Sequence, residues 1–175
     1  LFQLAALELI LSRLLEPAVL IIVILFQNDI RRALARVGRG FFPSFSADQE
    51  IQVVEEIVRT AGGLSQRRHG ALIVLERESN LGDLIEAGVP VDAQLSKELL
   101  ASIFQPSSPM HDGAVVVQEG RVSSAGCILP LTLRTDLPEG LGTRHRAAVG
   151  ITEETDALVV VVSEETAKIS VVLGG

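Results

Sequence analysis

The feature that most constrains the fold of this chain is a series of short apolar runs that follow Gly70. Each run has the length of a β-strand and is rich in Val and Ile. Glu119-Gly120 makes a tight connection between the second and third of the runs, which predicts an antiparallel hairpin. The series therefore predicts a β-sheet at the centre of the fold. The runs cover residues 71–75, 114–117, 122–129, 157–162 and 169–173.

Helical signals lie before and between these runs. Residues 46–49 (Ser-Ala-Asp-Gln) form a capping-box pattern, and the apolar residues that follow recur at helical spacing, which predicts an amphipathic helix over residues 48–61. Gly62-Gly63 should weaken or end this helix. Two further helices are expected over residues 96–104 and around residues 144–152. Because strands and helices interleave without strict βαβ repetition, we predict an α/β fold with a mixed β-sheet flanked by helices.

The N-terminal third of the chain differs from the rest. Residues 18–26 are nine consecutive apolar residues. A bilayer crossing needs about 20 residues, so length alone leaves a buried core helix and a membrane span equally open. Pro17 stands where a helix can begin, and residues 28–40 carry four arginines against a single acid, which is the positive-inside pattern. We therefore expect residues 1–40 to hold a transmembrane helix and a juxtamembrane basic segment, as a fragment of a larger membrane region.

At 175 residues, the chain is long enough for one folded domain with a sizeable core and has little room for two. We expect a linker over residues 41–47 and this domain over residues 48–175. The formal net charge of −7 argues against a surface that coats nucleic acid, so nucleic acid is not an expected partner. Cys127 is the only cysteine, which excludes an intrachain disulfide and a cysteine-based zinc cluster.

Hydrogen-bond donors suited to a polyphosphate are concentrated at residues 142–146 (Gly-Thr-Arg-His-Arg), which offer a hydroxyl, two guanidinium groups and an imidazole. Thr143 could cap the helix that follows, and a helix N-terminus favours phosphate. The alternative is a solvated helix turn with basic side chains. Two arginines one residue apart point to different sides of a helix, so both can meet one ligand only at a helix end or in a pocket.

Two acidic motifs add groups for metal and hydroxyl chemistry. Residues 110–114 (Met-His-Asp-Gly-Ala) place the Asp112 carboxylate between a histidine and a glycine, and Gly113 removes a side chain where a ligand could approach the backbone. Residues 163–166 (Ser-Glu-Glu-Thr) supply hydroxyl and carboxylate oxygens at a strand end, which suit a divalent cation. The plain alternatives are an Asp-Gly turn and an acidic hairpin turn.

In their order and spacing, four segments strongly resemble the diadenylate cyclase family and its DAC domain. They are residues 70–72 (Gly-Ala-Leu), 110–114, 142–148 and 163–165. The resemblance covers residues 48–175 and rests on blocks that are far more specific together than any short pattern alone. It extends to the N-terminal segment, which looks like the last membrane helix of the membrane-anchored diadenylate cyclase A type.

The resemblance implies a nucleotidyltransferase, an enzyme that condenses two ATP molecules into cyclic di-AMP and releases two pyrophosphates. It also implies a divalent metal ion, Mg²⁺, Mn²⁺ or Co²⁺, that lowers the pKa of the attacking hydroxyl and neutralises developing charge. The residues that match the family's catalytic positions are Asp112, Gly113 and Ala114. Those that match its ATP-binding positions are Gly113, Ala114, Ile128, Leu129, Thr143, Arg144, His145, Arg146, Ser163 and Glu164. The expected metal ligands are Asp112, His111 and Glu165.

One departure from the family concerns the base. Members of this class commonly have an aromatic residue after the cysteine that precedes the Leu-Pro-Leu segment, whereas Cys127 is followed here by Ile128, and the chain contains no Tyr or Trp. Adenine would therefore be held by aliphatic packing from Ile128 and Leu129.

The expected partners follow from the product. Because cyclic di-AMP is two-fold symmetric, the simplest active assembly is a homodimer in which each protomer presents one ATP. The resemblance further implies a place in the cell membrane, single-pass or multi-pass, with the catalytic domain in the cytoplasm and regulatory proteins as further partners. Two alternatives stay open: a catalytically silent nucleotide-binding regulatory module tethered to the membrane, and a membrane-tethered interaction domain whose basic stretch at residues 31–39 meets anionic lipid or a partner.

Overall fold

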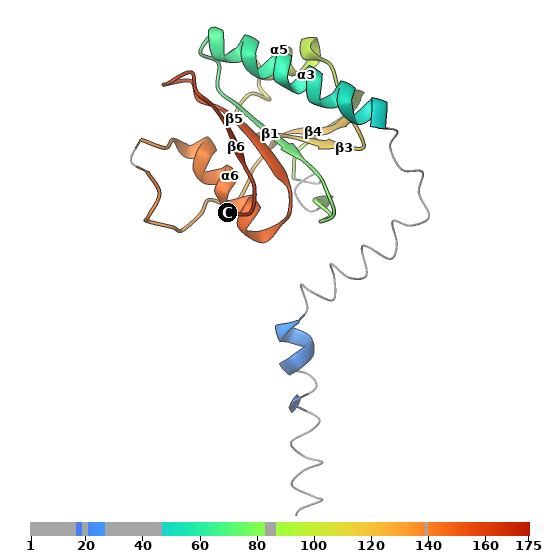
Figure 1. Cartoon of the computed structure of the whole chain (residues 1–175), viewed down its shortest axis with the longest axis vertical. Helices are drawn as coiled ribbons and strands as arrows, with labels where there is room; N and C mark the ends of the chain where they lie inside the picture. The colour runs from blue at the N-terminus through green and yellow to red at the C-terminus, as the bar shows by residue number, and fades with distance from the viewer. Residues whose placement is uncertain (1–16, 19–20, 27–46, 83–86, 139) are drawn as a thin grey trace, which may run out of the picture. The chain divides into compact units, whose positions relative to one another are not determined.

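The computed structural model describes residues 17–18, 21–26, 47–82, 87–138 and 140–175 (Figure 1). The chain divides into two units, Leu1–Phe42 and Pro43–Gly175. In the first unit, the described residues are mainly helical and the apolar side chains of residues 21–26 are exposed. No helix within the described residues is long and apolar enough to cross a membrane. Most of residues 1–40, where the transmembrane helix was predicted, and most of the predicted linker fall outside the described ranges.

The second unit is built around a six-stranded sheet with the strand order β2-β4-β3-β1-β5-β6. β1 and β3 run parallel, and every other neighbouring pair is antiparallel. The predicted mixed sheet is therefore confirmed. The strands are β1 (Ala71–Leu75), β2 (Val89–Gln94), β3 (Ala114–Gln118), β4 (Arg121–Cys127), β5 (Leu158–Val162) and β6 (Ile169–Val172).

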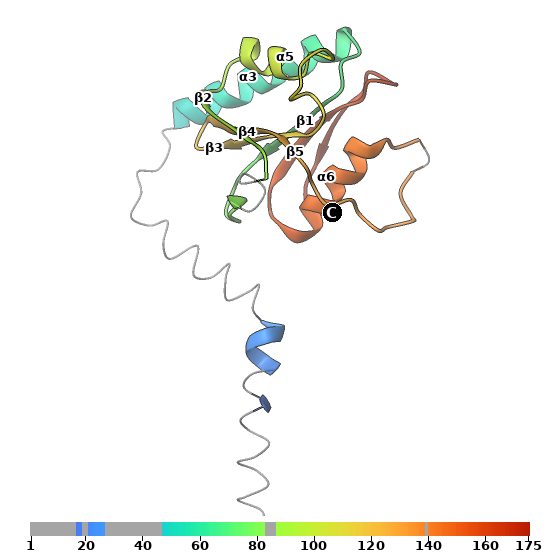
Figure 2. The same cartoon turned by 180° about the vertical axis from the view of Figure 1, so that it is seen from behind.

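Helices cover both faces of this sheet, as Figures 1 and 2 show from opposite sides. On one face lie α3 (Ala47–Gln66) and α5 (Lys97–Ile103), and on the other lies α6 (Thr143–Glu154). Successive side chains of a strand point to opposite faces. Accordingly, Ala71 and Ile73 of β1 pack with α3 and α5, while Leu72 and Val74 pack with α6. The result is a three-layer arrangement with a hydrophobic core on each side of the sheet.

Local sequence signals account for most element boundaries. The five predicted strands are all present, with ends that differ from the prediction by at most two residues. The predicted hairpin joins β3 to β4, and both turn residues adopt the positive φ that such tight turns require, 46° at Glu119 and 69° at Gly120. Ser96 caps α5, since its side chain accepts a hydrogen bond from the amide of Leu99.

The predicted end of the first helix was wrong. α3 continues through Gly62-Gly63 and ends at Gln66, five residues beyond the expected end at Ala61. Ile57, Ala61 and Leu64 lie on one helix face, and all three are buried against the sheet with exposures of 4%, 2% and 2%. Burial of this continuous apolar face outweighs the cost of about 1 kcal/mol for each glycine in a helix.

β2 is a strand that the sequence analysis did not predict. Its sequence, Val-Pro-Val-Asp-Ala-Gln, contains a proline and lacks a continuous apolar run. The strand lies at the edge of the sheet, paired only with β4, and the pairing register shifts between Pro90 and Ala93, where Asp92 has a φ of 43°. Proline is tolerated in edge strands and bulges because it cannot donate a ladder hydrogen bond. Pairing with β4, rather than local propensity, makes this segment a strand.

Candidate functional site

One edge of the sheet brings the predicted motifs together. β1 begins beside the end of β5, because Ala71 pairs with Val162. β3 runs parallel to β1 and begins at the same edge, and β4, antiparallel to β3, ends there. The motif at residues 110–114 precedes β3, and the motif at residues 163–166 follows β5. Strands are about 4.8 Å apart, so the two motifs are separated by roughly 10 Å, with β1 between them.

The start of α6 lies at this edge and forms a pocket with the end of β5. The pocket is lined by residues 142–145 and 162–165. Gly142 is the N-cap residue, with no side-chain cap, and its carbonyl accepts hydrogen bonds from the amides of His145 and Arg146 at 3.1 and 3.2 Å. The prediction that Thr143 caps α6 was therefore wrong, since the helix begins at Thr143 itself. The first amides of a helix have no partner within it, so this end of α6 can bind an anion.

Arg144 is the central cation of the pocket. Its Nη1 donates to Oε2 of Glu164 at 2.9 Å, and its side chain is 22% exposed. Its Nε is buried and has no hydrogen-bond acceptor among the described residues. A buried donor without an acceptor is costly, so an anionic ligand that reached this side of the guanidinium would satisfy it. Gly70 lies against the same group, and a Cβ there would be 2.6 Å from Cζ of Arg144.

The His145 side chain is half-buried. Burial lowers the pKa of His145 below its usual value, because a charged imidazolium would be poorly solvated there. Its Nε2 lies 3.4 Å from Oγ of Ser170 on β6. At neutral pH the ring therefore contributes a neutral imidazole to the pocket rather than a third positive charge.

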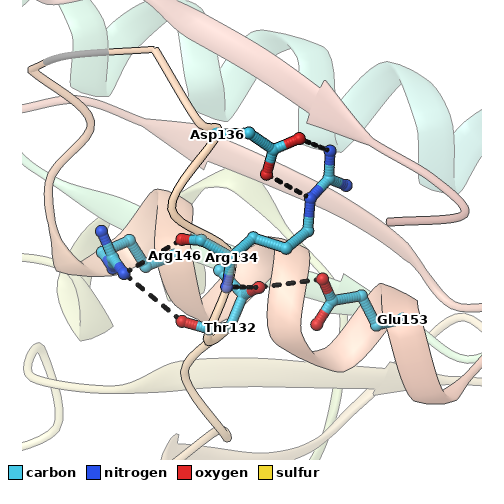
Figure 3. A network of polar contacts seen from close by, with 5 residues as sticks. All are labelled: Thr132, Arg134, Asp136, Arg146 and Glu153. Atoms are coloured by element: carbon cyan, nitrogen blue, oxygen red, sulfur yellow. Dashed lines mark hydrogen bonds and ion pairs between the residues drawn. The ribbon is translucent and has the colours of Figure 1, made fainter.

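Arg146 is not among the residues that line the pocket, and Figure 3 shows its guanidinium beside the backbone of Thr132 and Arg134. Its Nη2 donates to the carbonyl oxygens of Thr132 and Arg134, each at 3.4 Å. The two arginines therefore contact different parts of the structure: Arg144 faces Glu164, and Arg146 faces the segment after β4. This agrees with the different directions in which neighbouring helical side chains point.

The motif before β3 presents an unpaired carboxylate. Asp112 is exposed and has no hydrogen bond or ion pair with the described residues. Nδ1 of His111 lies 2.6 Å from the carbonyl oxygen of Ser108. A carbonyl can only accept, so Nδ1 carries the proton and Nε2 is left as an acceptor or metal ligand.

Gly113 and Ala114 have structural roles in this motif. Gly113 has a φ of 136°, and a Cβ there would be 2.6 Å from the backbone carbon of Gly126. Glycine is thus required by the close approach of β3 to β4. The side chain of Ala114 is fully buried in the core between the sheet and α6. A ligand at this motif would meet the Asp112 side chain and backbone groups.

The turn between β5 and β6 carries the third motif. Oγ of Ser163 accepts from the amide of Thr166 at 3.2 Å, and the side chains of Glu164 and Glu165 are exposed. The last turn of α3 and the residues that follow it hold this turn in place: Ser65 donates to the Ala167 carbonyl at 2.6 Å, and Arg68 donates to the Glu165 carbonyl at 2.8 Å.

Ile128 and Leu129 face different surroundings. Ile128 is 79% exposed at the end of β4, whereas Leu129 is 7% exposed and packs in the core beneath α6. Only Ile128 therefore presents an apolar side chain to a ligand without repacking of the core.

The donor set suits a hard divalent cation that is shared with a ligand. Within the described ranges, no three side chains of His, Cys, Asp or Glu come close enough to hold a metal ion, so His111, Asp112 and Glu165 do not form one cluster in a single chain. Mg²⁺ is usually held by one or two carboxylates together with substrate phosphates and water. The free carboxylate of Asp112 and the free Nε2 of His111 fit that mode.

Several residues that shape the site were missed by the sequence analysis. Ser65 and Arg68 hold the turn after β5, and Thr132 and Glu153 hold the segment after β4. They make contacts over separations of 21 to 102 residues. No periodic pattern or short motif signals such contacts, so only the folded structure reveals them.

Comparison with known proteins agrees with the predicted resemblance. Residues 58–175 match the DAC family model, described as the nucleotide-binding domain of the DisA bacterial checkpoint controller. The chain is 42% identical to the cyclic di-AMP synthase CdaA of Bacillus subtilis over 98% of its length, and 42% identical to a diadenylate cyclase of Listeria monocytogenes over 99%. These relatives are longer proteins, of which the chain spans 64% and 65%.

Solved structures agree as well. The crystal structure of a double mutant of DacA from Staphylococcus aureus has a TM-score of 0.71 and 43% identity, covering 74% of this chain and 86% of that one. A protein from Bacillus cereus, described as a hypothetical membrane spanning protein, has a TM-score of 0.67 and 50% identity, covering 70% and 60% of the two chains. The chain belongs to the DAC family of nucleotide-binding domains.

Proposed function

We propose that this chain is a diadenylate cyclase, which converts two ATP molecules into cyclic di-AMP and two pyrophosphates. The observation that carries the proposal is the meeting of an anion pocket and a free carboxylate at one edge of the sheet. Arg144 and the start of α6 supply the pocket, and Asp112 supplies the carboxylate. Relatives named as cyclic di-AMP synthase and diadenylate cyclase support the same assignment.

Different residues of the site bind the triphosphate and the adenine of ATP. The pocket at the start of α6 binds the triphosphate of one ATP through the free helix amides and the Arg144 guanidinium, whose Nε lacks an acceptor among the described residues. Arg146 supplies a second guanidinium, and Ser163 a hydroxyl. The exposed Ile128 packs against adenine, while the buried Leu129 supports it from the core.

The chemical step is an in-line displacement at each α-phosphorus. The 3′-oxygen of one nucleotide forms a bond to the α-phosphorus of the other, and the bond between that phosphorus and the pyrophosphate oxygen breaks. Asp112 accepts a hydrogen bond from the attacking hydroxyl and orients it, and the hydroxyl proton passes to water. Asp112 and His111 would hold a divalent ion, which would neutralise charge on the phosphates, while Glu165 of the same chain does not join these two residues in one cluster.

Two protomers complete the reaction. Each ATP lies in the pocket of one chain, and its α-phosphorus must meet the hydroxyl of another ATP, so two chains face each other about a two-fold axis. The symmetry of the product supports this arrangement.

We also propose that the protein acts at a membrane, with this domain on the cytoplasmic side. Support comes from the exposed apolar side chains of residues 21–26, the arginines at residues 31–39 and the description of the Bacillus cereus relative. Recovery of the full chain in the membrane fraction of cells, resistant to high-salt washing, is the expected result. Release by salt would contradict it.

The decisive experiment on catalysis uses the full chain with ATP and Mg²⁺, Mn²⁺ or Co²⁺, followed by identification of the product by mass spectrometry. Cyclic di-AMP is expected from the wild type. Asp112→Asn should lower turnover at least about 100-fold and retain ATP binding. Asp92→Asn is the matched control, because Asp92 pairs with Arg121 toward the other end of the sheet. Binding of ATP without product under all three metals would instead indicate a silent nucleotide-binding module.

A further inference from the structure

Every polar atom of Thr132 takes part in a hydrogen bond. Its amide donates to the carbonyl of Arg146 at 3.1 Å, and its own carbonyl accepts from Nη2 of Arg146 at 3.4 Å. Its hydroxyl donates to Oε1 of Glu153 at 2.8 Å and accepts from the amide of Arg134 at 3.2 Å (Figure 3). Thr132 is only 3% exposed. A buried residue with all its hydrogen bonds made fixes the position of the groups around it.

The segment that contains Thr132 lies directly on α6. A Cβ at Gly150 would be 2.8 Å from the amide nitrogen of Thr132 and 3.0 Å from the carbonyl carbon of Pro130. Contacts therefore occur at Arg146, Gly150 and Glu153, positions spaced four and three residues apart on one face of the helix. The segment is fixed along two turns of α6.

The consequence concerns the Arg146 side chain. Its Nη2 is held by the carbonyl oxygens of Thr132 and Arg134, and both carbonyls belong to the segment that Thr132 and Glu153 fix. No other acceptor among the described residues is found for Nη1 or Nε of Arg146. These remaining donors are available to a ligand, and their direction depends on where the two carbonyls lie.

We infer that Thr132 and Glu153 are positioning residues for ATP: their hydrogen bond fixes the segment whose carbonyls aim the Arg146 guanidinium at the triphosphate. The inference rests on the proposed function, because it takes ATP as the ligand of Arg146. The Arg134–Asp136 ion pair, with two contacts of 3.0 Å, lies on the same segment but is exposed to solvent. The buried hydroxyl of Thr132 is therefore the stronger constraint.

The test replaces Thr132 with the isosteric valine in the full chain. Thr132→Val should raise the KM for ATP by about tenfold with kcat changed by less than about twofold, because it weakens a charge-assisted contact made equally to substrate and transition state. The Kd of a non-hydrolysable ATP analogue, measured by calorimetry, should rise by the same factor. Thr132→Ser, which keeps the hydroxyl, should restore both values.

A double-mutant cycle identifies the partner. Glu153→Ala should raise KM as Thr132→Val does, Glu153→Gln should raise it little because its amide oxygen still accepts, and the double variant Thr132→Val with Glu153→Ala should show no further rise. Thr60→Val is the matched control, because Thr60 is equally buried but its hydroxyl donates only within α3, to the carbonyl of Glu56. It should lower Tm without changing KM or Kd.

The outcomes separate this inference from the proposed function. A wild-type chain that binds the analogue but makes no cyclic di-AMP refutes the cyclase proposal, while the Kd values still decide the role of Thr132. Unchanged KM and Kd in Thr132→Val, or an equal rise in Thr60→Val, overturn the positioning role alone. A wild-type chain that does not bind the analogue overturns both.

Discussion

Gly70 packs against the guanidinium of Arg144. A Cβ at residue 70 would lie 2.6 Å from Cζ of Arg144 and 2.8 Å from Oε2 of Glu164, so the ion pair between these side chains occupies the space that a larger residue would need. Gly70 ends the connection from α3 and leads into β1, and it thereby couples the start of the sheet to the anion pocket.

Gly70→Ala is expected to weaken ATP binding with little loss of stability. The methyl group would displace the ends of two flexible side chains, which costs the fold less than about 1 kcal/mol but moves the main cation of the pocket. We expect the Kd for an ATP analogue to rise about tenfold, as for the loss of one charge-assisted contact. Calorimetry for binding and urea denaturation for stability check the two halves of this prediction.

Gly62→Ala is the control for that variant. Nothing lies within 4 Å of a Cβ at Gly62, which is in the interior of α3. Alanine should therefore stabilise the fold by up to about 1 kcal/mol through helix propensity and leave ATP binding unchanged. Equal effects of the two substitutions on the Kd would rule out a specific contact between Gly70 and the pocket.

The sequence predicted those parts of the fold that depend on local patterns. Strands rich in Val and Ile and the Glu119-Gly120 turn are specified by neighbouring residues, so their positions were confirmed to within two residues. The end of α3 depends on burial of Leu64 against the sheet, and β2 depends on pairing with β4. Both are long-range effects that override local propensity, and both were missed or misplaced.

The same division holds for the candidate site. The three motifs were recognised from their residues, but the register of β1, β3 and β5 is what gathers them at one edge. The structure also separates two neighbours that the sequence had grouped, since Arg144 faces Glu164 and Arg146 faces Thr132. The spacing of the two arginines predicts that they point in different directions, whereas the partners that each one meets are decided by tertiary contacts.

The pKa of His145 predicts how stability depends on pH. Burial lowers this pKa, so the folded state binds fewer protons than the unfolded state once the pH falls below about 6.5, the ordinary pKa of histidine. The contribution is therefore fully present at higher pH and is lost as the pH falls from about 6.5 toward the folded pKa. Urea midpoints measured between pH 7.5 and 5.5 should decrease for the wild type and less steeply for His145→Gln. Parallel slopes for the two proteins would contradict this assignment.

Asp156 is expected to stabilise the connection after β1. Its two carboxylate oxygens accept hydrogen bonds from the amides of Ser79 and Glu78 at 2.8 and 3.0 Å. Burial alone would raise the pKa of Asp156, but these bonds and one with the Ser79 side chain lower it overall. Asp156→Asn should cost about 1–2 kcal/mol at neutral pH, because the amide nitrogen of asparagine cannot accept from a backbone amide.

The pH dependence of that cost is a further check. A carboxylate with a lowered pKa stabilises the fold above its unfolded pKa of about 3.9 and loses this contribution as the pH falls through the folded value. The difference between wild type and Asp156→Asn should therefore shrink below about pH 4. Asp92→Asn makes the same chemical change in an exposed ion pair with Arg121 and should cost less than about 0.5 kcal/mol.

The proposed two-fold reaction predicts that activity depends on the concentration of the chain. Below the dissociation constant of the dimer, the fraction of paired chains is proportional to total concentration, so activity per chain should fall about tenfold for each tenfold dilution. Inactive Asp112→Asn chains should also lower the activity of wild-type chains, because they form pairs with them. With a ninefold excess, random pairing leaves about a tenth of the wild-type chains in fully active pairs, so their activity should fall to about a tenth.

An excess of Asp92→Asn chains is the control for that mixing experiment, because the substitution lies away from the edge of the sheet that carries the site. These chains should pair with the wild type and keep activity per total chain unchanged. The comparison separates loss of a working partner from any general effect of added protein. Activity per chain that is constant on dilution and insensitive to Asp112→Asn chains would mean that one protomer completes both displacements, and the facing arrangement of two pockets would then be wrong.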